Sequence, residues 1–91
     1  MQETIHTALV DVNDSCLVII DVQGAFLDKL PTEEVAPLVQ RMLWLVRVAI
    51  QLEVPVVVTA EDINQNGSII PALAKILQPD TRIYNLSLIH I

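Results

Sequence analysis

The segment at residues 16–22, with the sequence CLVIIDV, constrains the fold of this chain more than any other. Apart from Asp21 its residues are apolar, mostly β-branched, and follow one another without polar alternation. A strand that is covered on both faces, as in a parallel sheet, needs such a continuous apolar run. We therefore expect a buried strand here, which starts after the turn-forming cluster that ends at Asp14.

An amphipathic helix is expected at residues 34–52, because apolar side chains recur there at spacings of three and four. Thr32 is the candidate capping residue, and the adjacent glutamates add favourable negative charge at the helix start. Pro37 fits this helix only if it lies in the first turn, where its missing N–H would have no partner in any case.

A second β-branched run at residues 54–60 completes a βαβ unit with parallel strands and a right-handed crossover. The expected elements that follow are a polar loop at residues 61–67, a short helix at 70–77 capped by Ser68, and a third strand at 81–85. The segment between the first strand and the long helix, residues 23–31, is expected to be a loop. These elements predict an α/β protein, specifically a Rossmann-like three-layer α/β/α fold with a parallel sheet, truncated to about its first three strands.

The composition of the chain indicates that it is one part of a larger protein. The chain has 91 residues, which is at most one small domain, yet 53% of them are hydrophobic and the mean hydropathy is +0.54. The net charge of −6, with five Lys and Arg residues, argues against a nucleic-acid partner. The longest apolar runs are too short to cross a membrane and the first residues lack a positively charged leader, so we expect no membrane partner and a cytoplasmic location.

The single cysteine, Cys16, cannot form an internal disulfide. Because it lies in the strand-like run, we expect it to be packed in the core as a small apolar side chain. A reactive thiol would need accessible, electropositive surroundings.

Acidic side chains follow both predicted strands at the edge where ligands bind in open parallel sheets. Asp21 is near the carboxyl end of the first strand, and Glu61 and Asp62 follow the second, so three carboxylates are expected at one crevice. A carboxylate at the end of an apolar strand is partly desolvated and suited to general acid/base duty. The alternative interpretation of Asp21 is a carboxylate that accepts hydrogen bonds from loop amides.

Cofactor and metal sites are not indicated. Neither glycine-rich phosphate-binding pattern follows the first strand, and we therefore expect no nucleotide cofactor. The loop at residues 61–67 has no histidine or cysteine, and we expect no metal.

The sequence LVIIDVQGAF at residues 17–26 resembles the first strand and following loop of the isochorismatase-like cysteine hydrolases. The family pattern is Asp-x-Gln-x-x-Phe, which corresponds here to Asp21, Gln23 and Phe26. An asparagine that is common after the glutamine is replaced by Gly24. The resemblance extends over residues 15–85.

This resemblance implies a catalytic role for Asp21, as the acid/base member of an Asp-Lys-Cys triad in a hydrolase that acts on a small amide or related substrate. Phe26 and Gln23 would be the substrate-binding residues: Phe26 would line the pocket, and Gln23 would organise the backbone behind Asp21. Leu86 stands where the lysine would be, and the nucleophilic cysteine would follow much later. The resemblance therefore implies an inactive N-terminal fragment whose full-length parent uses a small-molecule substrate, needs no cofactor and forms a homo-oligomer.

Two boundaries follow from this interpretation. Residues 1–85 are expected to be the N-terminal half of the hydrolase domain. Residues 86–91 have the sequence LSLIHI, which is also the translation, in one frame, of a transposon-end adapter used in sequencing libraries. These residues are therefore expected to be foreign to the protein. The alternative for residues 86–91 is a genuine amphipathic strand.

A rival function is a non-enzymatic α/β binding module, or a receiver-like signalling module that uses the strand-end aspartate as a phosphate acceptor. The receiver-like module predicts a second acidic residue beside Asp21, where Val22 and Gln23 stand. A catalytically inactive relative that only binds partners is a further alternative.

Overall fold

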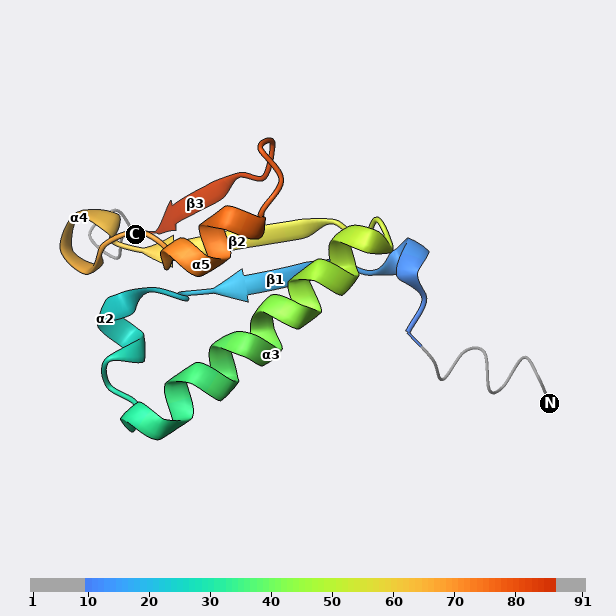
Figure 1. The fold of residues 1–91 in the computed structure, drawn as a ribbon. Coiled ribbons are helices and arrows are strands. Elements are labelled where there is room, and N and C mark those ends of the chain that lie inside the picture. Colours follow the sequence, from blue (N-terminus) through green and yellow to red (C-terminus); the bar gives the residue numbers. More distant parts are fainter. Residues whose placement is uncertain (1–9, 87–91) are drawn as a thin grey trace.

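The computed structural model describes residues 10–86 and contains a parallel sheet of three strands in the order β1-β2-β3. The strands are β1 (Leu17–Ile20), β2 (Val56–Glu61) and β3 (Ile83–Leu86). Helix α3 (Thr32–Gln51) connects the first two strands and α5 (Pro71–Ile76) lies between the second and third (Figure 1). The predicted α/β class and the parallel βαβ unit are confirmed.

The register of the three strands determines which residues lie side by side at the ends of the sheet. Ile20 at the end of β1 pairs with Thr59 of β2, and Thr59 pairs with Tyr84 of β3. All three strands point the same way, so their carboxyl ends meet at one edge of the sheet (Figure 1).

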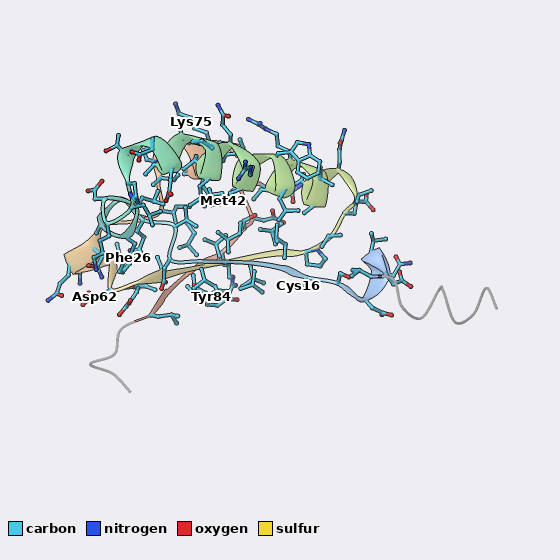
Figure 2. All side chains as sticks on the ribbon, turned by 90° about the horizontal axis from the view of Figure 1, so that it is seen from below. Cys16, Phe26, Met42, Asp62, Lys75 and Tyr84 are labelled. Atoms are coloured by element: carbon cyan, nitrogen blue, oxygen red, sulfur yellow. The ribbon has the colours of Figure 1, made fainter. Side chains whose placement is uncertain are left out.

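The core lies between the sheet and the two helices α3 and α5, which cover the same face (Figures 1 and 2). Ile19 and Val58 from the strands meet Val46 of α3 and Leu73 of α5 in this layer, and all four side chains are buried. In Figure 2, Met42 lies between helix and sheet, whereas Tyr84 lies on the opposite side of the sheet. The described residues therefore form two layers.

The other face of the sheet is not covered by any element in residues 10–86, contrary to the expectation of a strand buried on both sides. Val18 is 49% exposed and Ile20 is 64% exposed, while Ile19 between them is buried. Two crossovers of one hand that proceed along a sheet in one direction deliver their helices to one face, which explains why the second face stays open.

Cys16 is exposed, so its expected place in the core is wrong for this structure. It precedes β1, which begins at Leu17, and strand alternation puts it on the same face as Val18 and Ile20. The apolar run alone did not reveal that this face lacks a covering layer.

Helix α3 starts two residues earlier than expected and has a different cap. Pro31 is the N-cap residue, and Thr32 is the first helical residue and makes no side-chain capping bond. Pro37 lies inside the helix beyond the first turn, which corrects the expectation for this residue. The missing N–H of Pro37 costs one helical hydrogen bond, and packing of buried Val46 and Ala49 compensates for it over the 20-residue helix.

Two short helices occupy segments that were expected to be loops. They are α2 (Gly24–Leu27) and α4 (Ile63–Asn66), and a 3-10 turn precedes β1 at Val12–Asp14. Helices of four residues are too short to generate an amphipathic period, so sequence patterning does not detect them. Helix α5 has Ile70 as its N-cap and Pro71 at its first position, and Ser68 does not cap it.

None of the helices within residues 10–86 has the length and apolar character needed to cross a membrane. Of the segment 86–91, Leu86 ends β3, where it pairs with Glu61, and residues 87–91 lie outside the described part of the chain, as do residues 1–9 of the expected domain.

Candidate functional site

The chain leaves β1 through a sharp turn at Asp21. Asp21 has a φ of 57°, in the left-handed region that aspartate adopts more readily than most residues. Its N–H donates to the carbonyl of Thr59 at 3.1 Å, and its own carbonyl accepts from the N–H of Gln23 at 2.9 Å. Asp21 is thus the last residue held by the sheet and the first of the loop at the carboxyl edge.

The carboxyl group of Asp21 is partly enclosed. Its Oδ1 atom is buried and has no hydrogen-bond partner in the structure. The interpretation in which loop amides satisfy this carboxylate therefore does not account for Oδ1. A buried acceptor without a donor is uncommon in folded proteins and calls for an explanation such as a catalytic role.

Gln23 is fully buried, with 0% exposure, and its amide joins two loops. Nε2 donates to the carbonyl oxygens of Glu61, at 3.1 Å, and Gly67, while Oε1 accepts from the N–H of Glu61 at 2.8 Å. Gln23 also forms an antiparallel bridge with Ile69, next to a bond from Ile70 N–H to Val22. The amide is committed to the protein, so Gln23 organises the backbone around Asp21 and presents no free group to a ligand.

Phe26 is half-buried in α2, beyond the turn at Asp21. The ammonium of Lys29 lies 5.3 Å from the centre of its ring, within the range of a cation–π contact. Figure 2 shows Phe26 at the same end of the molecule as Asp62. One side chain from each loop of the carboxyl edge thus lies at this end.

Glu61 and Asp62 share the carboxyl edge with Asp21, and all three are half-buried. Asp62 also has a positive φ, of 42°, and its N–H donates to the carbonyl of Leu86. Within residues 10–86 no three His, Cys, Asp or Glu side chains lie close enough together to hold a metal ion. The three carboxylates occupy one edge without forming such a group.

Sequence patterning missed two contributors to this edge. Thr59 carries a buried Oγ1 without a partner beside the Asp21 turn, and Asn85 Oδ1 accepts from the N–H of Ile63 at 3.0 Å. Thr59 interrupts an otherwise apolar run, which is the one local signal for it. The bond from the Ile63 N–H to Asn85 spans 22 residues and has no local sequence signal.

No family model, curated protein or solved structure matches this chain. The chemistry of the site therefore has to be inferred from its own residues: a half-buried carboxylate at a strand end, held by a left-handed turn and by a buried glutamine clamp.

Proposed function

We propose that Asp21 is the proton-transfer residue of an α/β hydrolase of the isochorismatase-like cysteine hydrolase type, which cleaves a small amide or related carbonyl substrate. The observation that carries this proposal is the buried, unpartnered Oδ1 of Asp21 at the carboxyl edge of the sheet. Leaving a buried acceptor unsatisfied costs about 1–3 kcal/mol, a cost that is expected where the partner is a substrate or another catalytic group.

In the proposed mechanism a cysteine thiolate attacks the substrate carbonyl, and Asp21 accepts the thiol proton and returns it to the leaving group. A lysine of the triad stabilises the charges. Leu86 stands at the position where the resemblance expects this lysine, and Cys16 precedes the amino end of β1, away from Asp21. We therefore propose that residues 1–91 by themselves do not turn over substrate.

The fold supports a larger sheet. In the described residues the outer edge of β1 has no partner strand and one face of the sheet, which carries Val18 and Ile20, is uncovered. A strand added beside β1, with its helices on the uncovered face, would produce the three-layer Rossmann-like arrangement. Asp21 would then lie at the point where the strand order reverses, which is where ligands bind in such folds.

Within this proposal Phe26 lines the substrate pocket, and Gln23 supports the pocket indirectly by bonding to Glu61 at the end of β2 and to Gly67 after α4. The full-length protein would be a cytoplasmic homo-oligomer that acts on a small molecule without a cofactor. Residues 1–85 would be its N-terminal half and residues 86–91 foreign.

The test is to recover the full-length gene, express the protein and assay it against a panel of small amides. We expect hydrolysis by the parent and a loss of about 100-fold or more in kcat/KM for Asp21→Asn, because general acid/base groups contribute on this scale. Asp28→Asn is the matched control, since Asp28 is exposed and follows the same loop. A parent without an amide substrate, or equal activity of both variants, would refute the proposal.

The same preparation distinguishes the receiver-like alternative. That function predicts that a small phosphodonor with Mg²⁺ adds one phosphoryl group to Asp21, detected by mass spectrometry and absent in Asp21→Asn. We expect no such modification.

A further inference from the structure

Strand β1 is an edge of the sheet, and one side of its backbone is unpaired within residues 10–86. The N–H groups of Leu17 and Asp21 donate to carbonyl oxygens at β2. Because successive residues of a strand direct their N–H and C=O groups to opposite sides, Val18 and Ile20 direct theirs away from β2. Two donors and two acceptors therefore line the outer edge of β1.

This edge lacks the features that protect edge strands from pairing. Residues 16–20, with the sequence CLVII, contain no charge and no proline, and both Val18 and Ile20 are exposed. Natural proteins place lysine, proline or a bulge at such edges to prevent association. The other edge strand, β3, differs, because the charged Arg82 precedes it and Asn85 lies within it. The β1 edge is therefore the side of this sheet that is open to another strand.

The outer edge of β1 is complementary to a second copy of itself. In an antiparallel pair, residues that face one another across closely spaced bonds exchange both hydrogen bonds. If Val18 of one copy faces Ile20 of the other, a two-fold axis passes at Ile19, and every outward N–H and C=O of Val18 and Ile20 gains a partner. The chain has a net charge of −6, so two copies approach most easily at an uncharged segment such as this one.

We propose that chain 1–91 forms a two-fold symmetric dimer in which the β1 strands of two copies pair antiparallel, with Val18 of each copy bonded to Ile20 of the other. The two three-stranded sheets then join into one. Such an interface is closed, because each β1 edge is occupied by its counterpart. The side chains of Val18 and Ile20 meet across the axis on the uncovered face and add to the pairing.

The dimer is independent of the proposed catalysis. In the full-length protein proposed above, the strand added beside β1 would occupy this edge, so the dimer belongs to chain 1–91. Absence of the dimer would leave the hydrolase proposal unaffected, and absence of amide hydrolysis by the full-length protein would leave the dimer unaffected.

The first test is sedimentation velocity of chain 1–91 over a range of concentrations. Val18→Pro removes the outward N–H without removing a bond to β2, and proline is tolerated at such a position of an edge strand. We expect this variant to weaken dimerisation by about tenfold or more, because two hydrogen bonds are lost across the axis. Val18→Thr keeps the N–H and the β-branched shape, and as the matched control it should weaken dimerisation by less than about threefold.

A second variant separates the β1 edge from the rest of the uncovered face. Tyr84→Lys puts a charge on this face at β3, away from the β1 edge (Figure 2). We expect it to leave dimerisation unchanged. A chain that stays monomeric at every concentration, dimerisation that survives Val18→Pro, or equal weakening by Tyr84→Lys would overturn the inference.

The last measurement uses the unmodified chain and so does not depend on the folding of a variant. Chains labelled with ¹³C are mixed with unlabelled chains, and isotope-filtered NOEs between the two are recorded. The proposed register places the Cα atoms of the two Ile19 residues about 4.5 Å apart across the axis, so we expect an Hα–Hα contact between them. Contacts between chains that involve only other surfaces, such as α3 or β3, would contradict the proposed dimer.

Discussion

Replacing Gln23 by leucine removes three hydrogen bonds from the candidate site while keeping a side chain of similar size. The Glu61 N–H and the Gly67 carbonyl lose the partners that Gln23 provides. The Glu61 carbonyl keeps the bond from Asn66 Nδ2 at 3.0 Å. Two groups are therefore left unsatisfied, at about 1–3 kcal/mol each, partly offset by burial of leucine in place of an amide.

We expect Gln23→Leu to lower the free energy of unfolding by about 2–4 kcal/mol, a large part of the total for a small domain. The assay is urea unfolding followed by far-UV circular dichroism, with amide hydrogen exchange at Glu61 as a local readout. Gln40→Leu, on the exposed side of α3, is the matched control and should change stability by less than about 0.5 kcal/mol. If Gln23→Leu lowers the free energy of unfolding no more than the control does, the hydrogen bonds of Gln23 do not stabilise this edge of the sheet.

Three further predictions concern the core, the uncovered face and the turn. Leu73→Ala should lower the free energy of unfolding, measured in urea, by about 2–5 kcal/mol because Leu73 is fully buried. The control Leu38→Ala changes a side chain that is 45% exposed and should lower it by less than about 1 kcal/mol. The uncovered apolar face should make chains associate with one another as their concentration rises, and Ile20→Lys should reduce this association in sedimentation velocity because it puts a charge on that face. Undiminished association of the variant would exclude this face as the cause. The free energy of unfolding should be about 1–2 kcal/mol lower for Asp21→Val than for Asp21→Asn, because a β-branched residue is strained at a φ of 57°. Equal urea-unfolding midpoints for the two variants would contradict this strain.

Local properties explain what could be predicted from the sequence. The strand preference of the apolar run around Ile19 and the helical period around Val46 arise within short windows, so β1, α3 and their parallel connection to β2 were predictable. The position of Asp21 at a strand end followed from the same pattern. The bounds of these elements shifted by one or two residues where caps and turns decide them, as at Pro31 and Ile70.

Contacts between distant segments decided the rest. The amide of Gln23 reaches Glu61, 38 residues away, and no local pattern specifies that pairing. The exposure of Cys16 and Ile20 depends on which face the helices cover, a property of the assembled layers that an apolar run does not encode. The sequence alone determined that a carboxylate ends an apolar strand. The tertiary structure decided that Oδ1 of this carboxylate is enclosed without a partner, because burial and pairing exist only once the strands and loops are packed together.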